Sequence, residues 1–354
     1  MRILSVHNIN NIASTYAREL AQRGHTTAVY EPDQRGAGAR LPIKVSLLPW
    51  RALTMARAAS QFRARHFDLV HIHWASYGVF STFSEIPVVI HCHGSDVRER
   101  LSHPLFGRVL TRTFAQAAAV LCITPDLLPV VRSVRPDAIF SPAPIDTAHF
   151  LPEQIVAGRA ARPWTILLFA RLDPQKGSEV ALAGIAKFTR HHPDVRVRLL
   201  DWGPLKEHYR QQYGGQYEFV PLVPPAQAQR LIVAADVIVG QFVLGSLGLA
   251  ELQAMSCAKP VICSFRYRDA YPLPPPLCQA MTADEVEAQL EHLYQHPAQA
   301  SILGQRARQW ISSYHSSSAL SDELELLYHA LLRHTSVAGV LRGGRQEGGI
   351  WRNK

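Results

Sequence analysis

Two cations stand five residues apart in the stretch FARLDPQKG, directly after an apolar run. They are Arg171 and Lys176, and the proline and glycine around Lys176 indicate a loop that leads into a helix. Cationic side chains beside a helix N-terminus favour phosphate binding, because the helix dipole adds positive charge at the same place. The pattern predicts a clamp for a diphosphate. An ordinary surface turn with ion pairs is the alternative.

A second loop of small residues lies in GQFVLGSLGLAELQAMSCAKPVI, residues 240–262. Gly245, Ser246 and Gly248 precede a helix that we expect to begin near Leu249, and the backbone N–H groups of such a turn can bind phosphate. This loop and the clamp both follow strands of one predicted sheet, so we expect them to lie together. The chain has no Walker A motif and no Asp-x-Asp sequence. We therefore predict neither a cofactor nor a metal ion at this site.

Four histidines occur as two pairs, in LVHIHW and VVIHCHGSD. His71 and His73 share one face of their strand, as do His91 and His93. The pairs could form a zinc site, but no cluster of cysteines or carboxylates accompanies them, so packing is favoured and no metal is predicted. His93 is different, because a glycine, a serine and Asp96 follow it. We expect His93 to point into a cleft and to bind a substrate hydroxyl or transfer a proton.

The first apolar run ends in the polar stretch HNINNIAS. Asn8 and Asn11 could help its backbone N–H groups to bind an anion or sugar hydroxyls. Ordinary turn and helix-cap chemistry is an equally good interpretation. The stretch lacks G-x-G-x-x-G, so no dinucleotide cofactor is predicted in this half.

Apolar runs alternate with amphipathic segments along the chain, which predicts parallel sheets covered by helices on both faces. The length of 354 residues suits two domains, because single cores rarely grow beyond about 250–300 residues. We predict an α/β protein with two Rossmann-like domains that face a central cleft, over 1–155 and 163–316, then a helix over 317–334 and a disordered tail over 335–354. The predicted strands are 3–7, 27–30, 44–48, 69–73, 88–92, 120–123 and 138–141, then 165–170, 196–200, 218–222, 237–241 and 260–263.

The formal charge of +9 is concentrated in the first half, where residues 1–150 hold 16 Lys and Arg against 10 Asp and Glu. An acidic partner such as an anionic membrane surface would fit this charge, and so would plain solvation of exposed helices. The basic helix predicted over 51–65 has the composition of an interfacial helix, with a solvated basic side as the alternative. No basic stripe interleaved with aromatics indicates nucleic acid.

The cellular compartment is predicted from two features. The start reads as a first strand rather than a signal peptide, and five cysteines without a C-x-x-C pattern indicate buried reduced thiols. We therefore expect a cytoplasmic protein, with peripheral attachment to the inner face of the plasma membrane as a further possibility.

Taken together, the stretches HGSD, ITPDLL, SPAPIDTAHF, ARLDPQKG, DWGP and GSLGLAELQAMSCAKPVI resemble the retaining GT-B glycosyltransferases of family 4. The resemblance runs from the first strand to about residue 334. It implies an acceptor domain, then a domain for the sugar nucleotide, and a last helix that crosses back to the first domain. It implies transfer from a UDP- or GDP-sugar to a glycan or lipid-linked acceptor, in the synthesis of cell-surface polysaccharide or glycolipid.

The resemblance also implies roles for single residues. His93 would lie near the reacting sugar, Arg171 and Lys176 would hold the donor diphosphate and stabilise the leaving group, and Gly248 and Leu249 would present backbone N–H groups.

The sequence departs from the family where it usually has two glutamates eight positions apart, because Gly245 and Gln253 stand there. Gln253 can still bond a ribose hydroxyl. Gln241 is the better candidate for the sugar, since Glu251 lies about 200° from Gln253 around the helix. A non-catalytic nucleotide-sugar-binding subunit and a GT-B epimerase or phosphorylase are the alternatives.

Overall fold

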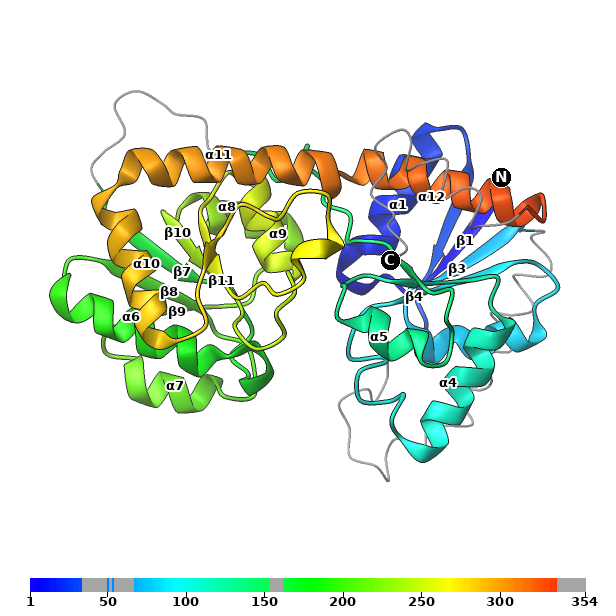
Figure 1. Cartoon of the computed structure of the whole chain (residues 1–354), viewed down its shortest axis with the longest axis horizontal. Helices are drawn as coiled ribbons and strands as arrows, with labels where there is room; N and C mark the ends of the chain where they lie inside the picture. Colours follow the sequence, from blue (N-terminus) through cyan, green and yellow to red (C-terminus); the bar gives the residue numbers. More distant parts are fainter. Residues whose placement is uncertain (34–49, 51–52, 54–66, 153–161, 336–354) are drawn as a thin grey trace. The chain divides into compact units, whose positions relative to one another are not determined.

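The structure is a computed structural model that describes residues 1–33, 50, 53, 67–152 and 162–335. Its contacts divide the chain into two compact units, each described here by itself (Figure 1). Unit 1 comprises Met1–Pro144 and the chain from Leu320 onward, and unit 2 comprises Ile145–Ala319. The division therefore lies about ten residues before the predicted boundary at 155, and residues 145–152 pack with unit 2.

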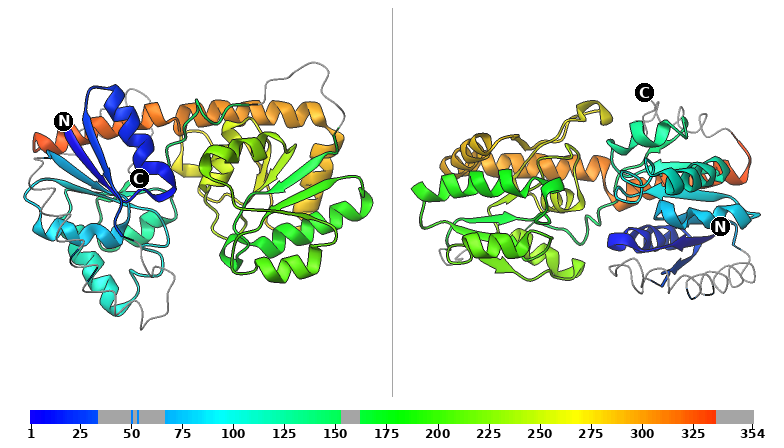
Figure 2. Two further views of the ribbon diagram at one scale, coloured as in Figure 1. Left: turned by 180° about the vertical axis from the view of Figure 1, so that it is seen from behind. Right: turned by 90° about the horizontal axis from the view of Figure 1, so that it is seen from below.

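Unit 1 is built on a six-stranded sheet in the order β2-β1-β3-β4-β5-β6, with every pairing parallel. The side chains of β3, β4 and β5 are all buried, as expected for strands covered on both faces. Figures 1 and 2 show helices on both sides of this sheet. The strands are β1 (Arg2–Val6), β2 (Thr26–Tyr30), β3 (Leu69–Ile72), β4 (Val88–Cys92), β5 (Ala119–Cys122) and β6 (Ile139–Phe140), and the helices are α1 (Ile12–Gln22), α4 (Pro104–Gln116), α5 (Leu127–Arg132) and α12 (Ser317–Leu332).

The helix α12 begins in unit 2 and continues on unit 1. Its Tyr328 hydroxyl lies 2.6 Å from Nδ1 of His71 on β3, and both side chains are buried. An ion pair between Arg23 and Asp322 joins the same helix to the end of α1. A hydrogen bond of 2.8 Å between Nε2 of His25 and Glu325 lies beside it. The apolar side of α12 thus belongs to the core of unit 1.

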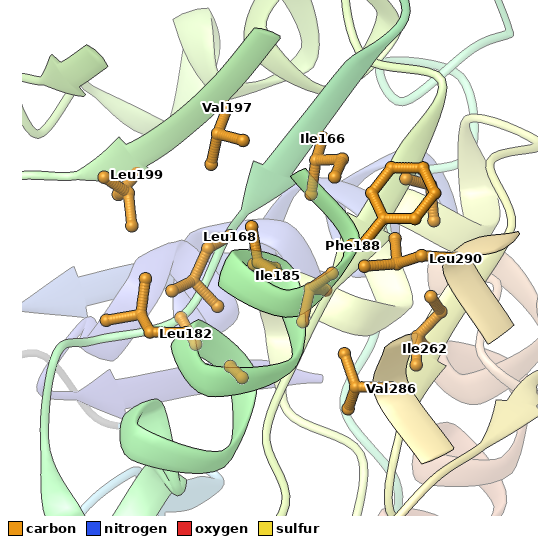
Figure 3. Packing of buried hydrophobic residues seen from close by; sticks show 14 of the residues in the cluster. Ile166, Leu168, Leu182, Ile185, Phe188, Val197, Leu199, Ile262, Val286 and Leu290 are labelled. Carbon is orange, nitrogen blue, oxygen red and sulfur yellow. The ribbon is translucent and has the colours of Figure 1, made fainter. Parts of the chain in front are cut away.

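Unit 2 repeats the architecture with a sheet in the order β12-β11-β10-β7-β8-β9, again parallel throughout. Figure 3 shows Ile185 and Phe188 of α6 packed among side chains of β7 and α10. The strands are β7 (Thr165–Leu168), β8 (Arg196–Leu200), β9 (Glu218–Val220), β10 (Val237–Val239), β11 (Val261–Cys263) and β12 (Cys278–Gln279), and the helices are α6 (Ser178–His191), α7 (Lys206–Tyr213), α8 (Pro225–Val233), α9 (Leu249–Ser256), α10 (Ala283–Gln295) and α11 (Pro297–Tyr314).

The predicted α/β class with two parallel sheets is confirmed. The strands β4 and β8 have the predicted bounds, and the other described strands that were predicted begin or end within two residues of them. The differences arise because the ladder of backbone hydrogen bonds, rather than apolarity, sets the ends of a strand. The two-residue strand β12 was not predicted. The strand predicted at 44–48 lies outside the described residues, as does nearly all of the basic helix at 51–65 and of the tail at 335–354.

Among the described residues, no helix is both long enough and apolar enough to cross a membrane. All five cysteines are buried and free, so the expectation of buried thiols is confirmed.

Candidate functional site

The loop after β7 carries both cations of the predicted clamp. A guanidinium nitrogen of Arg171 lies 2.5 Å from Oδ2 of Asp173, and Oδ1 of Asp173 accepts the N–H of Gln175 at 2.8 Å. The guanidinium also lies over the ring of Trp202, 5.8 Å from its centroid. Asp173 therefore has two roles: it caps the short helix η3 (Pro174–Lys176), and it orients the Arg171 side chain. Arg171 still exposes 37% of its side chain to solvent, so it can meet a ligand.

Lys176 is joined to the second predicted loop through Gln241. Nζ of Lys176 donates to Oε1 of Gln241 at 2.8 Å, and the amide nitrogen of Gln241 donates to the carbonyl of Ser246. A backbone hydrogen bond joins the same two loops, because the Phe242 N–H donates to the Lys176 carbonyl at 2.9 Å. The expected proximity of the two loops is therefore present within unit 2. Gln241 is buried with both ends of its amide bonded, so it positions the cation and is poorly placed to bind a sugar, contrary to our expectation.

Glu251 organises the start of α9 from inside the protein. Its side chain is only 2% exposed, and its two oxygens accept the N–H groups of Gln241 and Gly248, each at 2.9 Å. The predicted role of the Gly248 N–H toward phosphate is therefore not available, because the carboxylate takes that hydrogen. The Leu249 N–H opens the helix and has no intrahelical acceptor, so it remains available to a ligand.

Gly245 adopts a left-handed backbone conformation, with φ of +67°. A Cβ at this position would lie 2.9 Å from both Cγ and Cδ of Arg266, and the Arg266 N–H donates to the Gly245 carbonyl at 2.8 Å. Any L-residue is strained here, and the space that a longer side chain would need is occupied by an arginine. A glycine therefore suits this loop, and any larger residue would strain the backbone and require the Arg266 side chain to move.

The remaining residues of the second loop differ in exposure. Ser246 is buried, whereas Leu249 and Gln253 are half-buried on α9. The Gln253 amide makes no side-chain hydrogen bond to any described residue, so it can bind a polar ligand. Of the side chains expected to bind the donor, Arg171, Lys176 and Gln253 are exposed enough to do so.

In unit 1, His93 directly follows β4, and Asp96 holds its backbone. Oδ1 of Asp96 accepts the N–H groups of His93 at 3.0 Å and of Gly94 at 2.7 Å, and Oδ2 accepts the Ala75 N–H at 2.8 Å. Asp96 is fully buried, so it positions the loop. Its role in this loop is therefore to hold the backbone at His93, Gly94 and Ala75.

His93 as a residue is half-buried, whereas its Nε2 atom is buried and has no hydrogen-bond partner among the described residues. Burial lowers the pKa of His93, and the nearby His91, His73 and His7 lower the pKa further. The ring is therefore neutral at pH 7, with one nitrogen that can accept a proton and one that can donate a hydrogen bond.

The loop after β1 has an unusual backbone. His7, Asn10 and Asn11 all have positive φ, at 70°, 50° and 62°, which is uncommon for residues other than glycine. Asn8 is tied to its surroundings, because its Oδ1 accepts the Ser14 N–H at 2.9 Å. The cap interpretation therefore holds for Asn8, while Asn11 is exposed at the start of α1.

Residues 9–148 match the family described as Glycosyltransferase Family 4. A D-inositol 3-phosphate glycosyltransferase of Segniliparus rotundus is 24% identical over 215 residues, which cover 56% of this chain and 48% of that protein. In sequence, the chain is therefore similar to family 4 glycosyltransferases over residues 9–148. It spans about half the length of the curated relative that it matches.

The fold is the GT-B fold of solved glycosyltransferase structures. Sucrose-phosphate synthase from Thermosynechococcus elongatus has a TM-score of 0.72 and 18% identity, with 95% of this chain and 100% of that chain covered. The HepE protein of Anabaena, solved with UDP and glucose, has a TM-score of 0.66 and 14% identity, with 92% and 98% covered.

Sequence reasoning missed two residues of the candidate site. Glu251 was not considered as a site residue because it lies on the opposite side of the helix from Gln253. That side faces the protein interior, where the carboxylate of Glu251 accepts two backbone N–H groups. Arg266 was not considered at all. Its contact with Gly245 crosses from β10 to β11, and no local signal in the sequence indicates it.

Proposed function

We propose that this chain is a retaining glycosyltransferase that moves a sugar from a UDP- or GDP-sugar to a glycan or lipid-linked acceptor. The bonded chain from Lys176 through Gln241 to the Ser246 carbonyl carries the proposal. It holds an ammonium group against a turn that leads into α9, which is the arrangement that a diphosphate needs. UDP is the first nucleotide to test, because HepE was solved with it.

We assign the electrostatic work to Arg171 and Lys176. Negative charge grows on the diphosphate as the bond to the sugar breaks, and cations that are already in place stabilise it without reorganisation. With two cations and the start of α9 available in unit 2, we propose that no metal ion is needed at the donor phosphates.

His93 has a separate role in the proposal. Its neutral imidazole would bond a hydroxyl of the reacting sugar or of the acceptor. Asp96 is committed to three backbone N–H groups, so we propose that retention occurs without a covalent intermediate on this carboxylate.

The acceptor is proposed to bind unit 1. The basic excess of residues 1–150 supports an anionic acceptor or membrane surface. A role in cell-surface polysaccharide or glycolipid synthesis and a cytoplasmic location, peripheral to the inner membrane face, belong to the same proposal. No nucleic acid partner is proposed.

The test begins with binding. Calorimetry with UDP, GDP and ADP would compare the wild type with Arg171→Ala/Lys176→Ala and with Arg306→Ala, which removes an exposed cation on α11. We expect one nucleotide to bind, the double variant to lose at least about tenfold in affinity, which is about 1.4 kcal/mol, and the α11 variant to bind normally. Equal affinity in all three proteins would reject the clamp.

Turnover then separates the enzyme from a binding subunit. The sugar form of the preferred nucleotide is incubated with the wild type and with His93→Ala, and free nucleotide and sugar products are measured. We expect the His93 variant to bind the donor normally and to lose about 10²–10⁴-fold in rate. Nucleotide binding with no turnover in either protein would support the binding subunit instead, and an altered sugar without a transferred one would support an epimerase.

A further inference from the structure

Three histidines from the two strands beside His93 meet in the interior of unit 1. His71 and His73 belong to β3 and the segment directly after it, and His91 belongs to the neighbouring strand β4. All three side chains are fully buried. Their rings lie close together, with centroids 3.9 Å apart for His71 and His73 and 5.4 Å apart for His71 and His91.

Most of the ring nitrogens in this cluster have no partner in the protein. Neither nitrogen of His73 has a hydrogen-bond partner among the described residues, and the same is true of Nε2 of His71 and Nδ1 of His91. A neutral imidazole always carries one N–H, so His73 buries an unsatisfied donor in either tautomer, at a cost of about 1–3 kcal/mol. Something that binds ring nitrogens would remove this cost.

Hydrogen bonds to residues outside the cluster hold two of the three histidine rings. Nε2 of His91 lies 3.1 Å from the Ser141 carbonyl, which can only accept, so Nε2 carries the hydrogen and Nδ1 carries the lone pair. Nδ1 of His71 lies 2.6 Å from the Tyr328 hydroxyl, and Nε2 of His71 carries a lone pair for a ligand when this hydroxyl is the acceptor. Histidines that bind metals are commonly oriented by such second bonds to a carbonyl or a polar side chain.

The spacing is close to that of a metal site. One nitrogen from each of His71, His73 and His91 lies within 4.8 Å of the others, so a single point lies within about 2.8 Å of all three. Zinc–nitrogen bonds are about 2.0–2.1 Å long. Each ring would therefore need to move inward by less than about 1 Å to bind one ion.

We propose that His71, His73 and His91 bind a zinc-like transition-metal ion inside unit 1. Imidazole nitrogens suit zinc and its neighbours in the first transition row, and burial lowers the pKa of all three rings, which keeps them in the neutral form that binds metal. A water or hydroxide would complete the usual four ligands. This reverses the sequence-based expectation, which placed no metal here because the partners of each pair could not be seen.

The site would be structural. It joins β3 to β4 beneath α12, and its last ligand, His91, stands two residues before His93.

The proposal is tested on the full chain expressed without a histidine tag. Metal content is measured by inductively coupled plasma mass spectrometry for the wild type, for His73→Ala and for His191→Ala, which removes an exposed histidine on α6. We expect about one zinc ion per wild-type chain and per control chain, and at least about tenfold less in His73→Ala. Equal metal in all three proteins would overturn the assignment.

A second measurement covers the case in which His73→Ala does not fold. The wild type is stripped with a chelator and titrated with Zn²⁺, and separately with Co²⁺ as a spectroscopic probe. We expect a rise in melting temperature that saturates at one equivalent, and the absorption bands of a tetrahedral Co²⁺ site. No metal as purified, no shift and no bands would overturn the proposal and leave the nitrogens to buried water.

The inference stands apart from the proposed function. We expect His93→Ala to keep its metal while losing transfer, and the Arg171→Ala/Lys176→Ala protein to keep its metal while losing nucleotide. Loss of metal in the unit 2 variant, with normal folding, would contradict the location of the site.

Discussion

Gln241 shows how one neutral side chain can set the charge of the candidate phosphate site. It accepts a hydrogen bond from Nζ of Lys176 without neutralising the ammonium group, because its oxygen belongs to an amide. A carboxylate of the same size would form an ion pair with Lys176 and reduce the attraction for a diphosphate.

We therefore predict that Gln241→Glu weakens nucleotide diphosphate binding by about tenfold or more, which corresponds to about 1.4 kcal/mol. The amide that donates to Ser246 is also lost in this variant. Gln241→Met, which removes both bonds without adding charge, is the matched control, and calorimetric affinities are the measurement. If both variants bind equally well, the added charge has no effect and the argument from Lys176 fails.

The backbone conformation at Gly245 accounts for the glycine that stands where the family pattern has a glutamate. Its positive φ costs an L-residue about 1–2 kcal/mol, and a Cβ would also press on Arg266. A glutamate at this position would strain the backbone and require the Arg266 side chain to move.

The two causes can be separated. We predict that Gly245→Ala lowers the free energy of unfolding by about 1–3 kcal/mol. In an Arg266→Ala background we expect the same change to lower it by less, but still by about 1 kcal/mol. Urea unfolding of the wild type, the two single variants and the double variant separates the backbone strain from the contact with Arg266. A cost that disappears completely without Arg266 would show that the backbone is not strained.

At the scale of elements, one buried carboxylate connects the end of β10 to the start of α9. Glu251 is the third residue of α9, and it accepts N–H groups from Gln241 and Gly248. Acidic residues near a helix N-terminus are favoured by the dipole as well. Hydrogen bonds to a charged group contribute about 1.5–3 kcal/mol each.

We predict that Glu251→Gln destabilises the protein by about 2–4 kcal/mol, because the amide replaces one accepting oxygen with a donor that faces a backbone N–H. Asp284→Asn is a useful comparison, since it breaks an exposed ion pair with Lys187, and we expect it to change stability little. Chemical unfolding checks both. Equal effects would mean that the carboxylate is replaceable by any acceptor.

The order of most strands and helices along the chain could be predicted, because buried strands and amphipathic helices have strong sequence patterns. β4 and β8 have the predicted bounds. The predicted proximity of the Lys176 and Gly245 loops followed from one rule, that strand ends of a parallel sheet lie together.

The details of the site could not be predicted in this way. The φ of Gly245, the inward turn of Glu251 and the approach of Arg266 depend on how three strand ends pack. The two histidine pairs were visible, but their meeting depends on the pairing of β3 with β4 and on Tyr328, which is 257 residues away from His71.

At the scale of the whole chain, the two units have separate sheets, and the chain returns from unit 2 to complete the core of unit 1. Leu324 of α12 is fully buried, whereas Leu326 on the same helix is 55% exposed. Burying a leucine side chain contributes about 1.5–3 kcal/mol, and a buried unpaired carboxylate adds several kcal/mol of cost.

We predict that Leu324→Asp unfolds unit 1 at a lower temperature while unit 2 keeps its own transition, because Leu324 packs in only one of the two cores. Calorimetric scans with and without the nucleotide that binds unit 2 would assign the two transitions. A ligand raises the melting temperature only of the unit to which it binds. Leu326→Asp replaces an exposed leucine on the same helix and should leave both transitions in place. If Leu324→Asp lowered both transitions together, the units would unfold as one body, and the return of α12 would stabilise the whole molecule rather than unit 1 alone.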